Sequence, residues 1–413
     1  DVYKRQALGA PIYDQKNTKL LGAGVVITTE LLERLRDRGI HSVIISLRDI
    51  ARLFAYQPQG SAKQAPASRQ GTQCALASST SNALDLRIDS GHALQLPAGA
   101  QAFKRKVKRR GTEPYSPEMQ NRFSQHHEQA VDELKEISGS LHKKQTADLK
   151  RLRTIATQSL AHAIEDIDLF ACLGANPHFS DCPSRHSVHV ANVAMATAIE
   201  MDLSERQIVE LAIGCLIHDV GMLAIPHANY EQERELNDEE YAEIAKHPVL
   251  TVELFAEHLA SLPFPSLLVA YQIHERPNGS GYPRGRSSDE IHVLARIASV
   301  ADAYTALVSP RPYRPGLQPY HAVRMMLKEV TEGLYDPAVV RALLRTISLF
   351  PLGSVVALQD ETVGKVIRSN PDKYDRPVIE IWKRDDLQAK PRILDLSRSE
   401  LQIERTLAQL PQQ

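Results

Sequence analysis

The chain has few of the residues that mark several large classes of protein. Only four of its 413 residues are cysteines, and none of them forms a Cys-x-x-Cys pair. The sequence therefore argues against a disulfide framework and against a cysteine zinc site, and it fits the reducing cytoplasm. No run of about eighteen uncharged apolar residues occurs, so we expect no membrane span.

Net charge is also nearly absent. The chain has 49 Lys and Arg against 50 Asp and Glu, which gives a formal net charge of −1. Such a balance gives no support for binding to nucleic acid or to an anionic membrane, and we expect neither. The run KRKVKRR at 104–110 is a local exception. We interpret it as part of a solvated linker, and a patch that recruits polyphosphate or RNA is the alternative.

The hydrophobic residues, 43% of the chain, can fill a sizeable core, and their spacing divides the sequence into four parts. Residues 7–50 predict a small α/β module, and residues 51–116, rich in Ser, Ala, Gln, Gly and Pro, predict a linker of low order with a hairpin at 84–98. Helical periodicity covers 117–345, and short alternating strands predict a small β extension at 346–400. The predicted fold class is mainly α.

One helix within this block ends on two polar residues. Apolar side chains recur at helical spacing through QIVELAIGCLI and predict one buried face, formed by Ile208, Leu211, Ala212, Cys215 and Leu216. His218 and Asp219 follow at once. Taken alone, such a pair is more often a polar cap over a core than a functional site.

Further His and Asp residues recur at intervals of 27 to 32 residues, which is about one helical hairpin each: His186, the His218–Asp219 pair, His247, His274 and Asp302. Successive hairpins of a bundle can direct such side chains toward one interior point, which is how metal sites in bundle cores are built. Asp302 lies beside an apolar stripe, where a carboxylate is costly unless it is paired or coordinated. Imidazole and carboxylate together suit iron, manganese or zinc. For any single one of the 16 histidines, a hydrogen-bonded or exposed role remains the commoner outcome.

The segment YQIHERPNGSGYPRG at 271–285 resembles the signature of the HD-GYP family, cyclic di-GMP phosphodiesterases within the HD metal-dependent phosphohydrolases. Four further segments are similar to that family and follow in its order: HSVHVANVA, LIHDVGMLAIP, HPVLTVELF and RIASVADAYTALVSPRPYRP. An isolated Gly-Tyr-Pro would be weak evidence. The whole series in order predicts an HD-GYP helical bundle.

The resemblance implies a set of ligands and a reaction. The ligands of a first metal would be His186, His218, Asp219 and Asp302, with Asp219 bridging to a second metal held by His247 and His274. The implied catalytic pair is His218 and Asp219. One or two divalent ions would carry a hydroxide that attacks the phosphorus of cyclic di-GMP, or of a related cyclic dinucleotide, to give linear pGpG and then GMP.

The resemblance also implies residues that bind the substrate. Gly281, Tyr282 and Pro283 would shape a loop beside the metals, although Asn-Gly-Ser-Gly just before them is also strong turn chemistry. Arg311 and Arg314 resemble the family's phosphate-contacting basic residues, and the planar fork of arginine suits a phosphate diester. A surface salt bridge is the alternative for either arginine.

Three positions depart from the family pattern. Met222 stands where the family commonly has a lysine, Ile273 where it usually has a histidine, and Cys182 where some members have a glutamate for a third metal. Cys182 argues against a third metal, and Met222 and Ile273 favour a second hypothesis, a weakened domain that acts as a cyclic-dinucleotide receptor or a protein-interaction module. We favour the enzyme, because a pure scaffold has no physical need for a buried metal quartet. A homodimer or a signalling partner is compatible with either hypothesis.

Overall fold

The structure of this chain is a computed structural model that describes residues 12–13, 19–21, 34, 38, 79–91, 102–175, 183–226, 237–310, 316–360, 362–383 and 389–407. The chain divides into two compact units, Asp1–Ala67 and Ser68–Gln413. In the first unit, β1 (Ile12–Tyr13) pairs antiparallel with β2 (Lys19–Leu21). Most of the α/β module predicted at 7–50 lies outside the described residues.

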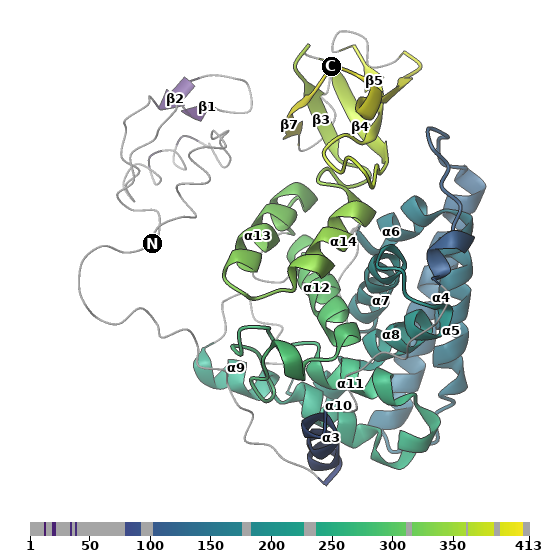
Figure 1. Cartoon of the computed structure of the whole chain (residues 1–413), viewed down its shortest axis with the longest axis vertical. Helices are drawn as coiled ribbons and strands as arrows, with labels where there is room; N and C mark the ends of the chain where they lie inside the picture. The colour runs from purple at the N-terminus through teal and green to yellow at the C-terminus, as the bar shows by residue number, and fades with distance from the viewer. Residues whose placement is uncertain are drawn as a thin grey trace. The chain divides into compact units, whose positions relative to one another are not determined.

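Two helices form the centre of the second unit (Figure 1). In α7 (Pro183–Glu200) every residue from His186 onward is buried, and in α8 (Glu205–Ile217) every residue from Gln207 onward is buried. Burial on all sides is expected of helices that are apolar around their whole circumference. The stretch Glu205–Ala224 has the length and apolarity of a membrane span, but 78% of its apolar window is buried inside the fold. These two helices therefore carry the core around which the others pack.

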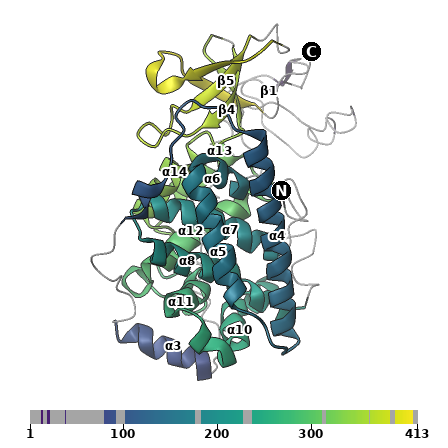
Figure 2. The ribbon, with the colours of Figure 1, turned by 90° about the vertical axis from the view of Figure 1, so that its right-hand side faces the viewer.

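The surrounding helices follow in chain order and enclose α7 and α8 (Figure 2). They are α4 (Pro117–His142), α5 (Lys150–Glu165), α6 (Ile167–Ala175), α9 (Asp238–Ile244), α10 (His247–Leu254), α11 (Phe264–Gln272), α12 (Val293–Val308), α13 (Pro319–Thr331) and α14 (Pro337–Ile347). Local sequence fixes several of their starts: Ser116 caps α4 before a proline, and Asp336 does the same for α14. The predicted mainly helical class, with a small C-terminal sheet, is confirmed.

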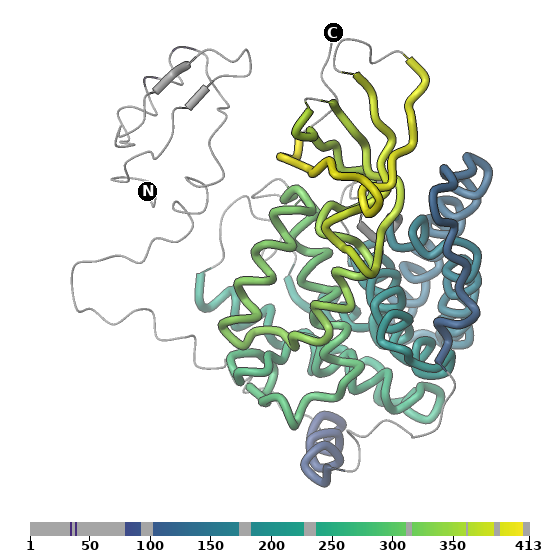
Figure 3. The backbone as a smooth tube through the Cα atoms, turned by 45° about the horizontal axis from the view of Figure 1, so that its top comes forward, coloured from purple at the N-terminus to yellow at the C-terminus, as the bar shows by residue number. Residues whose placement is uncertain are grey.

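The C-terminal sheet has five antiparallel strands in the order β6-β5-β4-β3-β7. The sheet is the yellow-green to yellow part of the tube in Figure 3. The strands are β3 (Val355–Leu358), β4 (Val363–Arg368), β5 (Val378–Trp382), β6 (Arg392–Asp395) and β7 (Ile403–Leu407), and β7 lies beyond residue 400, where the predicted extension ended. Arg368 on β4 is buried and donates to both carboxylate oxygens of Asp166, at 2.6 and 2.8 Å. A buried ion pair therefore ties the sheet to the helices.

The linker predicted at 51–116 is wrong at 79–89 and at 103–106, which are helical. Residues 79–89 form helix α3 (Ser79–Asp89), so the first half of the predicted hairpin is helical. The alternation of Leu84, Leu86 and Ile88 suggested a strand, but Leu86 is 72% exposed while Leu84 and Ile88, four residues apart, are buried. The apolar pair at helical spacing, covered by a partner surface, determined the outcome.

The basic run is largely exposed, but two of its charges form ion pairs with the helical core. Lys104 and Arg109 each lie 2.9 Å from Glu200 at the end of α7, a carboxylate whose side chain is only 3% exposed. Phe103, in the short 3-10 helix η2 (Phe103–Lys106), is buried in the main core. A buried carboxylate requires cationic partners, and the run supplies two of them beside Arg345, which lies 3.0 Å from Glu200. These two charges are therefore engaged within the fold, and they support neither the linker nor the RNA interpretation.

Candidate metal centre

The six predicted ligands come from five different helices and converge in the core of the helical unit. His186 lies in the first turns of α7, His218 ends α8, His247 begins α10, and Asp302 lies in the middle of α12. Asp219 directly follows His218, and His274 lies two residues beyond the end of α11. Helix ends are suited to this task because they bring the side chains of several helices to one point without interrupting their cores.

The first group of ligands is His186, His218 and Asp302, all buried. The His186 Nε2 atom lies 2.9 Å from Asp302 Oδ1, and the His218 Nε2 atom lies 4.0 Å from the same oxygen. One donor atom of each residue lies within 4.8 Å of the other two. Donors at such separations can bind a common ion.

The ligands predicted for a second ion are Asp219, His247 and His274. Asp219 Oδ1 lies 3.3 Å from His218 Nε2 and 3.5 Å from His247 Nε2, so this carboxylate lies between the two imidazoles. One donor atom each of His218, Asp219 and His274 again lie within 4.8 Å of one another. Asp219 thus lies close to both His218 and His247, and its sharing between two ions stays a prediction.

Backbone carbonyls orient two of the imidazoles. The Nδ1 of His218 donates to the carbonyl of Cys215 at 2.7 Å, and the Nδ1 of His247 donates to that of Ile244 at 2.8 Å. Each bond fixes the tautomer and leaves the Nε2 lone pair directed into the cluster. The Nε2 atoms of His218, His247 and His274 are buried without a hydrogen-bond partner in the described part of the chain. Such atoms are costly in a closed core, and a bound cation would satisfy them.

Electrostatics favour the protonation states that a metal requires. Burial acts to raise the pKa of Asp302, but the hydrogen bond from His186 and the nearby imidazoles outweigh it and lower that pKa. The pKa of Asp219 is lowered in the same way, against burial, chiefly by His218 and His247. Burial lowers the pKa of His247 and of His274. Charged carboxylates beside neutral imidazoles present electron pairs to a cation without first losing a proton. The residues present therefore fit a divalent metal.

A glycine and a threonine that the sequence analysis did not assign hold two of these ligands together. The Gly221 amide donates to Thr251 Oγ1, and that hydroxyl donates to the His218 carbonyl, both at 2.9 Å. A Cβ on Gly221 would lie 2.2 Å from the His247 carbonyl oxygen. Only glycine allows the chain after Asp219 to approach α10 this closely.

The Gly-Tyr-Pro loop lies directly against the cluster. A Cβ on Gly281 would lie 2.4 Å from the His274 carbonyl, and the Tyr282 amide donates to that carbonyl at 3.2 Å. The Tyr282 ring stacks on the His274 imidazole with centroids 4.8 Å apart, and Pro283 is buried behind it. The three residues thus lie beside the candidate metals, and their contact with substrate stays a prediction.

Glu275 was not predicted and organises this loop. Its carboxylate is buried and accepts the backbone amides of Arg284 at 2.7 Å and Arg286 at 2.9 Å. Burial raises the pKa of Glu275 to about 7, although these amides act to lower it. The sequence signal that could have identified Glu275 is its position directly after the predicted ligand His274.

The structure describes two of the remaining positions singled out in the sequence, and three lie outside the described residues. Ile273 is 0% exposed and belongs to the main hydrophobic core. Met222 is half-buried in the short helix η3 (Val220–Ala224), which follows Asp219. Arg311, Arg314 and Cys182 lie outside the described residues, so the substrate contacts predicted for the two arginines stay predictions.

A pocket of about 190 Å³ gives access to the cluster. Its wall comes from α4, from the start of α7 and from the segment after α8, and it includes Lys135, Ser138, Ser187, Asp219 and Leu223. Asp219 keeps some exposure there, in contrast to His218. The candidate bridging carboxylate can therefore be approached from outside the core.

Comparison with known proteins agrees with this geometry. Residues 174–339 match the family described as HD domain. The cyclic di-GMP phosphodiesterase PA4108 of Pseudomonas aeruginosa is 28% identical over 218 residues, 52% of this chain and 51% of that protein. The cyclic di-GMP phosphodiesterase PdeB of Borreliella burgdorferi is 27% identical over 241 residues, 57% and 62% of the two chains. The chain thus spans between half and two thirds of the length of these two relatives.

Two further similarities complete the comparison. The 3'3'-cGAMP-specific phosphodiesterase 3 of Vibrio cholerae is 30% identical over 167 residues, 40% of this chain and 35% of that protein. Among solved structures, Bd1817, an HDG"Y"P protein from Bdellovibrio bacteriovorus, is 15% identical with a TM-score of 0.47, covering 83% of this chain and 95% of that one. Residues 174–339 are therefore similar to HD domains, and the loop at Gly281, Tyr282 and Pro283 resembles that of the HD-GYP group.

Proposed function

We propose that this chain is a metal-dependent phosphodiesterase that hydrolyses cyclic di-GMP to linear pGpG and then to GMP. The observation that carries the proposal is the convergence of six His and Asp side chains in the core, with buried imidazole nitrogens that have no hydrogen-bond partner among the described residues. Relatives named as cyclic di-GMP phosphodiesterases support this substrate, and relatives named as cGAMP-specific make a related cyclic dinucleotide the alternative substrate.

The proposed cofactor is one or two divalent ions of iron, manganese or zinc, which suit imidazole and carboxylate donors. His186, His218 and Asp302 would hold the first, His247 and His274 the second, and Asp219 would be shared. A bound cation would supply Lewis-acid activation of water and of the phosphodiester. Water would add across one P–O3′ bond, so the phosphate stays on the 5′ oxygen and the 3′ oxygen leaves as a hydroxyl.

The chain's own residues would prepare the site for this reaction. The carbonyls of Cys215 and Ile244 hold two imidazoles in the tautomer that can bind a cation. Tyr282 covers one face of His274, and burial raises the pKa of Tyr282, so its phenol stays neutral. The loop and the pocket at Asp219 would then leave a restricted approach for a phosphodiester.

A second candidate function, a cyclic-dinucleotide receptor without turnover, is favoured by one observation. Ile273 is buried in the hydrophobic core, so it contributes no donor to the second ion, which would have three protein ligands from Asp219, His247 and His274. Met222 also provides no cation for a substrate phosphate. Both features would weaken catalysis more than nucleotide binding.

The deciding experiment measures metal content and cyclic di-GMP turnover on anaerobically purified protein. Asp219→Ala should remove both metal and hydrolysis while the circular dichroism of the helices is retained, because either ion needs this carboxylate. Asp132→Ala, at an exposed carboxylate on α4, is the matched control and should behave as wild type. Metal and activity near wild type in Asp219→Ala would contradict the proposal. Tight nucleotide binding without turnover in wild type would favour the receptor.

We also propose that the functional unit begins at α3, earlier than the boundary at 117 suggested by periodicity. Phe103 lies in the main core, Glu200 depends on Lys104 and Arg109, and α3 covers a separate apolar cluster. Truncation at 117 would expose these surfaces. The cytoplasm is the proposed compartment, supported by the free thiols of Cys172 and Cys215.

A further inference from the structure

Helix α3 packs against the two helices that lead to two of the candidate ligands. Its apolar residues Leu84 and Ile88 join a small cluster with Val249 and Val252 of α10 and with Leu268 and Tyr271 of α11. The Arg87 guanidinium also lies 3.5 Å from the centroid of the Phe264 ring. Because α10 begins at His247 and α11 ends two residues before His274, α3 supports the outer side of the candidate second site.

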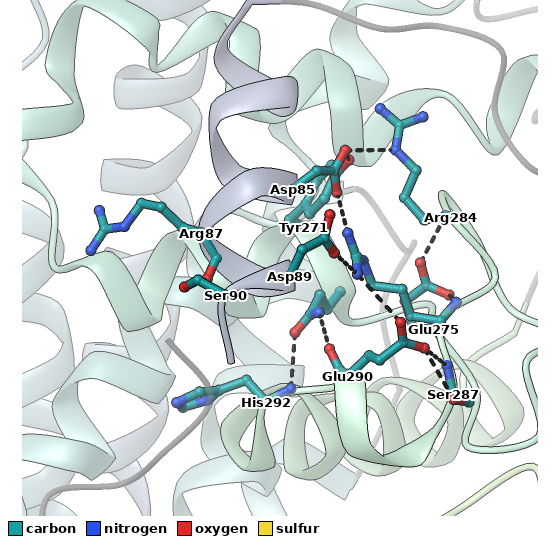
Figure 4. Close-up of polar contacts among 12 residues, drawn as sticks. Asp85, Arg87, Asp89, Ser90, Tyr271, Glu275, Arg284, Ser287, Glu290 and His292 are labelled. Atoms are coloured by element: carbon teal, nitrogen blue, oxygen red, sulfur yellow. Dashed lines mark hydrogen bonds and ion pairs between the residues drawn. The ribbon is translucent and has the colours of Figure 1, made fainter. Parts of the chain in front are cut away.

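The polar edge of α3 contacts the loop that follows the Gly-Tyr-Pro sequence (Figure 4). Asp85 accepts hydrogen bonds from Arg284 Nε at 2.9 Å, from an Arg286 terminal nitrogen at 2.8 Å and from the Tyr271 hydroxyl at 3.0 Å. Asp89, one turn later, accepts from the other terminal nitrogen of Arg286 at 2.8 Å. Asp85 is only 18% exposed, so its charge is fully engaged by these three donors.

The same two arginines are held a second time through their backbone. Their amides donate to the carboxylate of Glu275, the residue after His274. The segment 275–286 is thus fixed from inside by Glu275 and from outside by α3, and Tyr282 within it stacks on His274. Charge-assisted bonds to arginine are stronger than neutral ones and more directional. Without the contact from α3, only the hydrogen bonds to Glu275 would hold the conformation of the loop.

We propose that Asp85 is a positioning residue of the candidate metal centre, which through Arg284 and Arg286 holds the loop that places Tyr282 on His274. The alternative is that α3 merely covers an apolar surface, in which case its carboxylates would not affect the loop. The inference rests on the proposed function only where metal affinity is the measurement. The conformation of the loop can be tested without it.

The test is Asp85→Asn in the full chain, which removes the charge and keeps the size of the side chain. Hydrogen–deuterium exchange with mass spectrometry should show the peptide containing 284–286 exchanging about ten-fold faster than in wild type, since these amides are protected by the fixed loop. Titration with Mn²⁺ alone should show about ten-fold weaker binding, the effect expected when support of a ligand is lost. Arg286→Gln should reproduce both results, and the double variant should add little, because the two residues share one interaction.

Two control variants separate positioning from stability. Leu86→Ala shortens a side chain of α3 that is 72% exposed, and it keeps the carboxylates and the buried apolar contact of the helix. Asp336→Asn removes a carboxylate of similar exposure, 19%, from Arg296, while asparagine still caps α14. Both should leave loop exchange and Mn²⁺ affinity within about two-fold of wild type, as is usual for substitutions away from a site.

The outcomes are distinct. Unchanged loop exchange in Asp85→Asn, or an equal increase in Leu86→Ala, would overturn the inference and leave the proposed function intact. A wild-type chain that binds no Mn²⁺ and hydrolyses no cyclic dinucleotide would overturn the proposed function, and loop exchange would then decide the inference by itself.

Discussion

Replacing Ile273 with histidine tests whether this position belongs to the metal centre or to the core. The family resemblance would make Ile273→His the restoration of a missing ligand. The structure predicts the opposite, because Ile273 is 0% exposed, ends α11 and lies within the main hydrophobic core. Loss of isoleucine burial costs about 2 kcal/mol, and an imidazole buried without a partner costs about 1–3 kcal/mol more. We expect a total of about 3–5 kcal/mol.

The assay compares wild type, Ile273→His and Ile273→Val on identical preparations. A loss of 3–5 kcal/mol should lower the melting temperature by roughly 5–15 °C, whereas Ile273→Val, which keeps the position apolar, should cost only about 1 kcal/mol. The number of Mn²⁺ ions bound per chain should be the same in all three. An additional bound ion in Ile273→His, with the melting temperature maintained, would refute the reasoning and show that the backbone can present position 273 to the site.

Three further predictions concern other parts of the fold. Gly221→Ala should cost about 1–3 kcal/mol and weaken Mn²⁺ binding, because its Cβ would collide with the His247 carbonyl; calorimetry and metal titration measure both. Arg368→Met should lower the free energy of unfolding in urea by about 3 kcal/mol or more, since it leaves the buried Asp166 carboxylate without its main partner. Burial lowers the pKa of His127 from 6.5 to about 4, so the unfolded chain binds this proton more readily than the folded one. The contribution of neutral His127 to the free energy of unfolding is complete above pH 6.5 and is lost as the pH falls toward 4. The loss is about 2 kcal/mol at pH 5. Urea denaturation at a series of pH values should show a flatter dependence between pH 6.5 and 4 in His127→Gln.

The helices and the convergence of the six His and Asp side chains were predictable from patterns within the sequence. The apolar spacing before His218 fixes a buried helix that ends there, and the carboxylate of Asp302 on an apolar stripe already indicates a compensating charge or ion. Regular intervals then suggest that these side chains meet. The structure brings all six predicted ligands together without any change to the set.

The errors concern residues whose role depends on partners far away in sequence. Leu84 and Ile88 predict little alone, because an 11-residue segment with two apolar residues becomes a helix only when α10 and α11 cover it. The basic run at 104–110 resembles a linker until Glu200, about 90 residues later, is known to be buried beside it. No local pattern contains that information.

Ile273 and Met222 depart from the family pattern in ways that affect different steps. Ile273 caps the end of α11 and packs into the hydrophobic core, whereas His274, beyond the helix, lies in the cluster. Ile273 thereby anchors His274 while it gives up a donor, and this should lower the affinity of the second ion and leave the first unchanged. Met222 follows Gly221 outside both ligand groups, so it cannot alter metal affinity through coordination and should act on substrate phosphate alone. Metal titration and the KM for cyclic di-GMP therefore report on the two departures separately. Met222→Lys should lower KM without changing the number of bound ions, and an added or lost ion in that variant would contradict the division of roles.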